Sequence, residues 1–245
     1  GLERMSPVRG LASGWAYQLR GIVTVGVLVV LWVMTWRESG QYLNKEALWR
    51  TTLARNPDAF MAWANLGDTL AQQGRHHEAI LAFRRGLQLR PDDAPVHNDL
   101  GCALVAIRES EAAIPILERA LQLRPGFGEV HNNLGNAFSR VGRGDDAIRH
   151  YEEAIRLKPA HFEALDNLGC ELVLKGRLPE AIARFEEAIR LSPDSVKYRR
   201  DLGTALARAG RLPEAIVQFE HVARLDPATP ASHAVLGNAL AAAGR

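Results

Sequence analysis

The chain has 245 residues, of which 47% are hydrophobic and only 7% aromatic, so thin repeated layers fit this composition better than one thick core. The 30 basic and 28 acidic side chains nearly balance, which, with the apolar content, excludes a disordered chain and a polyanion-binding tail. Residues 1–57 carry seven Lys and Arg against three Asp and Glu, leaving 23 and 25 for the remainder. The basic excess therefore belongs to the N-terminal end.

An apolar segment, residues 21–36, follows a basic N-terminal segment, residues 1–20. It reads GIVTVGVLVVLWVMTW, without a charge. As a helix it spans roughly 24 Å, short of the ~30 Å hydrocarbon core of a bilayer, although Arg20 can snorkel and residues 16–19 can extend it. Trp15, Tyr17, Trp32 and Trp36 lie where interfacial aromatic residues anchor membrane helices. We expect a single transmembrane helix here, with a buried helix or a cleaved signal peptide as alternatives; arginines on both sides leave its orientation open.

The rest of the chain is a sequence repeat with a period of 34 residues. Prolines recur at 57, 91, 125, 159, 193 and 227, and Leu-Gly pairs at 66/67, 100/101, 134/135, 168/169, 202/203 and 236/237. The predicted units are 60–93, 94–127, 128–161, 162–195 and 196–229, followed by a half unit, 230–245.

Each unit predicts two helices. In 128–161, Leu134 and Phe138 follow helical spacing, glycines interrupt the pattern at 142 and 144, and it resumes until Pro159. Gly135 and Ala147 allow the two backbones to approach closely. Because a 34-residue hairpin cannot bury its own apolar face, neighbouring units must stack into an elongated solenoid.

This period and pattern resemble the tetratricopeptide repeat family over residues 60–245. The resemblance implies an all-α, right-handed α-solenoid of stacked helical hairpins, here preceded by a single membrane-type helix. Trp63 occupies the first aromatic place of the family pattern, whereas His97, His131, Leu165, Arg199 and His233 depart from it, and Arg108 replaces a turn glycine. Residues 37–59 are predicted to form a junction and half repeat, with Trp49 in the phenylalanine place and Pro57 closing the unit.

In this family the first helices of the units line the concave surface. The place before each Leu-Gly pair holds an amide or carboxylate five times, at Asn65, Asp99, Asn133, Asn167 and Asp201, and neighbouring places add Asp68, Asn98, Asn132, Asn136, Asp166 and Arg200. An Asn side chain offers both a donor and an acceptor to a peptide backbone. The run resembles the asparagine ladders of O-GlcNAc transferase and kinesin light chain, which implies a groove for extended peptides. Alternatively, these side chains only bond the adjacent unit's helix.

A second resemblance concerns the junction from Trp36 to Gly67. It is similar to membrane glycosyltransferases of the protein O-mannosyltransferase type, in which the last membrane helix leads into repeats on the extracytoplasmic side. The acidic catalytic motif of that family lies between earlier membrane helices, and no such helices occur in these 245 residues. A start at Gly1 and an unfinished repeat at Arg245 are compatible with a fragment of such an enzyme.

The sequence shows no catalytic constellation. Adjacent acids such as Glu152 and Glu153 diverge by about 100° on a helix, and no phosphate-binding loop or nucleophile elbow is present. Cys102 and Cys170 lie two units apart, too far for a disulfide, and the histidines do not cluster with ligand spacing. We therefore predict no enzyme activity, no cofactor and no bound metal, and the lack of a basic stripe predicts no nucleic-acid partner.

These patterns together predict a membrane-anchored scaffold that binds extended segments of protein or peptide partners in its concave groove. It would be a membrane protein through residues 21–36, with the side of the repeats extracytoplasmic if the glycosyltransferase resemblance holds. The alternative is the C-terminal substrate-recognition region of a multi-spanning membrane glycosyltransferase whose catalytic part lies outside this chain.

Overall fold

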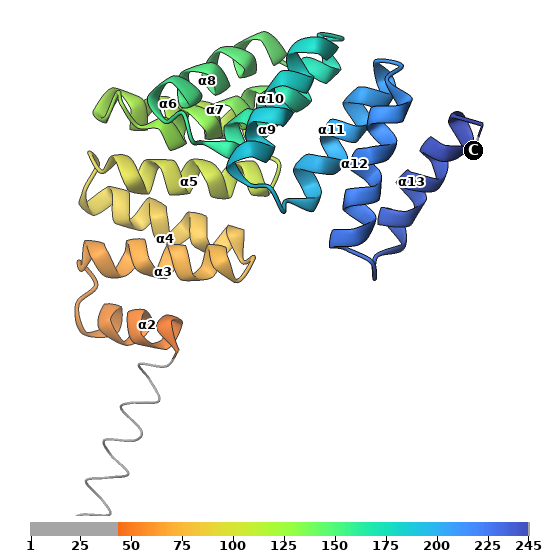
Figure 1. The fold of residues 1–245 in the computed structure, drawn as a ribbon. Coiled ribbons are helices and arrows are strands. Elements are labelled where there is room, and N and C mark those ends of the chain that lie inside the picture. The colour runs from red at the N-terminus through yellow and green to blue at the C-terminus, as the bar shows by residue number, and fades with distance from the viewer. Residues whose placement is uncertain (1–43, 245) are drawn as a thin grey trace, which may run out of the picture.

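The computed structural model describes residues 44–244. The predicted basic segment, residues 1–20, and membrane helix, residues 21–36, lie outside the described residues. Residues 44–244 form twelve α-helices and no strand (Figure 1). The helices are α2 (Lys45–Arg55), α3 (Phe60–Gln72), α4 (His76–Leu89), α5 (Ala94–Ala106), α6 (Ser110–Leu123), α7 (Gly128–Arg140), α8 (Gly144–Leu157), α9 (Phe162–Leu174), α10 (Leu178–Leu191), α11 (Val196–Arg208), α12 (Leu212–Leu225) and α13 (Pro230–Ala242).

The helices pair into five hairpins, α3–α4, α5–α6, α7–α8, α9–α10 and α11–α12, with α2 before the first and α13 after the last. Each second helix also packs against the first helix of the next hairpin, which confirms the predicted all-α solenoid. The first helices of neighbouring hairpins contact one another, whereas the second helices in residues 44–244 make no comparable contacts. The stack therefore curves with its first helices on the inner, concave side, along the path seen in Figure 1.

Close approach within each hairpin depends on the glycine of the Leu-Gly pair. Leu134 and Ala147 are fully buried, and a Cβ added at Gly135 would lie 2.4 Å from the ring of Tyr151. The corresponding glycines of the other four hairpins face Phe83, Leu117, Phe185 and Phe219 in the same way. At Gly237 in α13, nothing lies within 4 Å of the added atom. The same residue of the repeat is thus tightly packed in one context and free in the other.

This contrast predicts opposite effects for two identical substitutions. Gly135→Ala pushes a methyl group into the Tyr151 ring and is expected to lower the free energy of unfolding by about 1 to 3 kcal/mol. Gly237→Ala meets open space and is expected to raise it by up to about 1 kcal/mol through helix propensity. Urea unfolding followed by circular dichroism measures both values. Equal effects at the two positions would contradict the packing role of this glycine.

The first aromatic place of the repeat has a hydrogen-bonding role. Trp63 Nε1 donates to the carbonyl oxygen of Pro57 at 2.7 Å, and Arg199 Nε donates to that of Pro193 at 2.8 Å. His97 and His233 place Nε2 at 2.8 and 3.0 Å from the carbonyl oxygens of the prolines six residues before them. These replacements, which sequence analysis treated as departures, keep the bond between a first helix and the turn preceding it.

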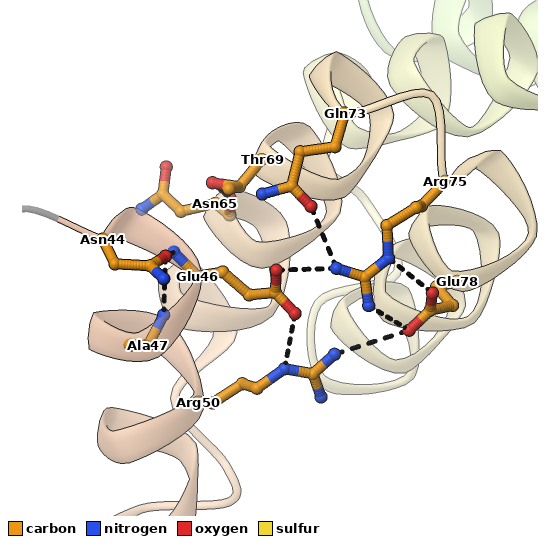
Figure 2. A network of polar contacts seen from close by, with 9 residues as sticks. All are labelled: Asn44, Glu46, Ala47, Arg50, Asn65, Thr69, Gln73, Arg75 and Glu78. Carbon is orange, nitrogen blue, oxygen red and sulfur yellow. Dashed lines mark hydrogen bonds and ion pairs between the residues drawn. The ribbon is translucent and has the colours of Figure 1, made fainter.

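A polar network attaches α2 to the first hairpin (Figure 2). Arg75 donates to Glu46 at 2.7 Å and to Glu78 at 2.6 and 2.7 Å, while Arg50 donates to Glu46 at 2.9 Å and to Glu78 at 3.4 Å. The bonds from Arg50 and then Arg75 hold the pKa of Glu46 below its ordinary value. Asn44 caps the helix by accepting from the backbone N–H groups of Glu46 and Ala47. This end of the stack is thus oriented by charges as well as by packing.

The turn between α5 and α6 differs from the others. Arg108 adopts a left-handed φ of 68°, where the remaining hairpins have glycine at 76° to 79°. A hollow of about 660 Å³ lies beside this turn, lined by Arg108, Glu109, Ser110, Glu111, Ala112, Arg140 and Val141. Its two arginines and two glutamates offset one another in charge, and it lies apart from the recurring amides described below.

Candidate functional site

Two amide contacts join consecutive first helices on the concave side. Asn133 Nδ2 donates to Asn98 Oδ1 at 2.8 Å, linking α7 to α5. Asn167 Nδ2 donates to Asn132 Oδ1 at 3.0 Å and to Asn136 Oδ1 at 3.1 Å, linking α9 to α7. The pairs 98/133 and 132/167 are both separated by 35 residues, one repeat plus one position. We call each such pair a rung.

The two rungs use only part of the hydrogen-bonding capacity of their asparagine side chains. Asn133 and Asn167 are half-buried, and the Oδ1 atom of each accepts no hydrogen bond from a described residue. An amide oxygen has two lone pairs and an amide nitrogen two hydrogens, so acceptor capacity remains on both side chains. The amides therefore do bond the adjacent unit, as one reading of the sequence predicted, and still offer acceptors to a ligand.

The N-terminal end of the concave face is acidic. Asp68 on α3 and Asp99 on α5 are half-buried, and neither forms an ion pair with a residue in the range 44–244. Burial raises the pKa of Asp99 to about 6, and the negative charge of Asp68 adds to the rise. Burial also raises the pKa of Asp68. Only Asn98 Nδ2, 3.2 Å from Asp99 Oδ1, favours the charged form of Asp99. This end is suited to a positively charged group.

The raised pKa of Asp99 predicts a pH-dependent cost. Since the folded pKa lies above the ordinary value of 3.8, the folded chain binds more protons than the unfolded chain between these values, and stability falls as pH rises. The cost is absent below about pH 4 and complete above about pH 6. Asp99→Asn is expected to raise the free energy of unfolding by about 1 to 3 kcal/mol at pH 7 and to have little effect below pH 4. Urea unfolding at the two pH values tests this.

The control for Asp99→Asn is Asp194→Asn, which changes an exposed aspartate between α10 and α11. A surface substitution of this kind is expected to change stability by less than about 0.5 kcal/mol at either pH. A gain for Asp99→Asn that is the same at both pH values would contradict the titration argument.

The third rung carries carboxylates in place of amides. Asp166 on α9 and Asp201 on α11 are again 35 residues apart, and Asp166 is only 1% exposed. Lys197 Nζ contacts Asp166 Oδ2 and lies 3.4 Å from Asp201 Oδ2, and Arg200 Nε lies 3.7 Å from Asp201 Oδ1. Cys170, one helical turn after Asp166, joins this cluster. Cys170 is an exposed residue, but desolvation of its thiol raises the pKa to about 11, with smaller contributions from Asp201 and Glu171.

Ten of the eleven residues predicted for the groove fall into three groups, and Asn65 lies outside them. The amide rungs hold Asn98, Asn132, Asn133, Asn136 and Asn167; the acidic end holds Asp68 and Asp99; and the carboxylate rung holds Asp166, Asp201 and Arg200. Asn65 lies near Thr69 and Gln73 at the α2 junction, and no bond joins its side chain to them (Figure 2). The role of the eleven predicted residues in peptide binding stays a prediction.

Lys197 and Cys170 were not among the residues predicted for the concave face, although both join the carboxylate rung. Lys197 precedes Asp201 by four residues and Cys170 follows Asp166 by four, so each shares a helix face with a predicted residue. A search along helical spacing from each rung would have found both. Cys102 and Cys170 are both free, in agreement with the prediction that they do not pair.

Models of the tetratricopeptide repeat match residues 39–94 and 167–230, 127–194, and 70–132, which together cover residues 39–230. The chain belongs to the tetratricopeptide repeat family. No curated protein matches the chain, so the glycosyltransferase resemblance of the junction gains no support from that comparison.

Solved structures share the fold. The chain is similar to MamA, with 28% identity over 66% of this chain and 95% of that one and a TM-score of 0.58. It is also similar to YrrB, described as a repeat protein with an unusual peptide-binding site, with 19% identity over 80% and 98% of the two chains and a TM-score of 0.60. The pilF protein of Pseudomonas aeruginosa matches at 20% identity over 75% of this chain and 89% of that one, with a TM-score of 0.63.

None of the helices in residues 44–244 has the length and apolar character that a membrane span requires.

Proposed function

We propose that this protein is a non-enzymatic scaffold that captures extended peptide segments of other proteins along its concave face. The observation that carries the proposal is the pair of amide rungs, in which Asn133 and Asn167 donate through Nδ2 and retain their Oδ1 atoms as acceptors. A peptide backbone presents N–H donors irrespective of its sequence, so acceptors spaced by the repeat suit an extended chain.

The charge along the concave face gives the segment a direction. Asp68 and Asp99 at one end lack basic partners among the described residues, whereas Asp201 at the other end is already next to Lys197 and Arg200. We infer that the bound segment carries a Lys or Arg side chain that reaches the Asp68 and Asp99 carboxylates. A cation there would offset the cost of burying these two charges, because opposite charges at short range favour the ionised carboxylates.

The proposal is tested with peptides selected from a random phage-displayed library on the wild-type protein. The double variant Asn133→Ala and Asn167→Ala removes both rungs and is expected to weaken the selected peptides at least tenfold by fluorescence anisotropy. It also removes three hydrogen bonds and is expected to lower the free energy of unfolding by about 1 to 3 kcal/mol. Selected peptides are expected to be enriched in Lys and Arg.

A control variant of similar stability separates binding from folding. Ile148→Val with Ile182→Val shortens two buried side chains on α8 and α10, away from the rungs, and is expected to cost about 1 to 3 kcal/mol. This control is expected to bind the selected peptides like the wild type. Equal losses of affinity in the two double variants, or a library that yields no binder, would refute the proposal.

We further propose that residues 21–36 anchor the scaffold in a membrane. The support is the sixteen-residue uncharged stretch, flanked by Arg20 and Arg37 and by tryptophans. The full chain is expected to float with liposomes in a density gradient, whereas residues 44–245 alone are expected to stay at the bottom. Replacing Val27 and Val30 with Lys in the full chain places charges in the apolar stretch and is expected to abolish flotation. Flotation of that variant would contradict the anchor.

A further inference from the structure

We propose that the carboxylate rung is a binding site for a thiophilic divalent cation such as Zn²⁺, with Asp166, Cys170 and Asp201 as ligands. One ligand atom from each of these residues lies within 4.8 Å of the other two. Asp166 and Cys170 come from successive turns of α9, and Asp201 comes from α11 in the next hairpin. In the described residues, this is the only group of three such side chains that meets this distance.

Comparison with the other rungs shows why this place is unusual. The rungs 98/133 and 132/167 are amide pairs, in which a nitrogen donor meets an oxygen acceptor. At 166/201 both partners are carboxylates, which have acceptors only when ionised and repel one another. In the other rungs the two side chains hydrogen-bond each other. Two ionised carboxylates cannot do so, and they need a cation between them.

Asp166 supplies a second, independent observation. Its side chain is 99% buried, and its Oδ1 atom has no hydrogen-bond partner among residues 44–244. A buried carboxylate oxygen without a donor costs free energy, and coordination of a metal ion is one of the ways in which proteins remove that cost. Asp166 is also one of the three residues whose ligand atoms lie within 4.8 Å of one another.

Lys197 now provides the positive charge. Its Nζ atom contacts Asp166 Oδ2 and lies 3.4 Å from Asp201 Oδ2, but its side chain is 52% exposed and flexible enough to leave the rung. Together with Arg200, whose Nε lies 3.7 Å from Asp201 Oδ1, this lysine balances the charge of the two carboxylates. A divalent cation that displaces the ammonium group adds a bond to sulfur and, together with Arg200, balances the charges of the two carboxylates and the Cys170 thiolate.

The sulfur atom selects the metal. Carboxylates alone suit Mg²⁺ or Ca²⁺, whereas a thiolate favours Zn²⁺ and softer ions, with metal–sulfur distances of about 2.3 Å and metal–oxygen distances of about 2.0 to 2.2 Å. On binding, the S–H bond of Cys170 breaks, its proton passes to solvent and a sulfur–metal bond forms. Cys170 and Asp201 also line a hollow of about 200 Å³ with Leu174, Phe185 and Thr204, which gives the ion a route from solvent.

The test is titration of the full chain with CdCl₂ and with ZnCl₂. Cadmium bound to a thiolate gives an ultraviolet charge-transfer band, and Zn²⁺ binding is measured by isothermal titration calorimetry. We expect one equivalent of either ion in the wild type, at least tenfold weaker binding in Cys170→Ser and in Asp166→Asn, and at least tenfold tighter binding in Lys197→Met, which removes the competing cation. Thermal unfolding followed by circular dichroism verifies that each variant is folded.

Cys102 is the matched control, because it occupies the corresponding place beside the amide rung of Asn98 and Asn133. Cys102→Ser is expected to leave the cadmium band and the affinity unchanged. Absence of the band in both wild type and Lys197→Met, or its loss in Cys102→Ser but not in Cys170→Ser, overturns the inference. The titrations contain no peptide, so such a failure leaves the proposed groove function unaffected.

Discussion

The close contact between the two helices of each hairpin is the constraint on which the molecule depends. A glycine on the first helix accepts the ring or branched side chain of the second, as Gly135 accepts Tyr151, and alanines such as Ala147 are fully buried beside it. This contact makes each hairpin a thin unit of two helices, and part of its apolar surface remains exposed to solvent in a single unit. Stacking is the only way to cover it, so the 34-residue repeat, the solenoid and the concave face all follow from one local packing solution.

Curvature then turns a packing requirement into a surface. Because the first helices contact one another and the second helices do not to the same extent, side chains of α5, α7, α9 and α11 meet at intervals of 35 residues. When both residues of a pair are Asn, one amide donates a hydrogen bond to the other, and the Oδ1 atom of the donor side chain remains available as an acceptor. The same amides therefore stabilise the stack and form the proposed binding surface, and structural and functional roles at Asn133 and Asn167 are not alternatives.

Sequence periodicity predicted the helices and the hairpins, because helix packing depends on residue size at fixed spacing. It did not predict how His97 and Arg199 replace an aromatic residue, since the shared feature is an N–H that reaches the carbonyl oxygen of a proline six residues earlier. Nor did it pair Asp166 with Asp201. That pairing requires the offset between neighbouring first helices, which is a property of the stack and not of a single unit.

Departures from an otherwise regular repeat therefore carry most of the information about this particular protein. At Arg108 the departure is conformational, since an arginine adopts a left-handed φ that glycine occupies in every other hairpin turn, and the charges around it offset one another. At Asp166 the departure is electrostatic, because two acceptors face each other where an amide pair would be neutral and satisfied. A strained turn can be maintained by the surrounding packing, but facing carboxylates persist only with a cation, whether it is the ammonium group of Lys197 or an ion that replaces it.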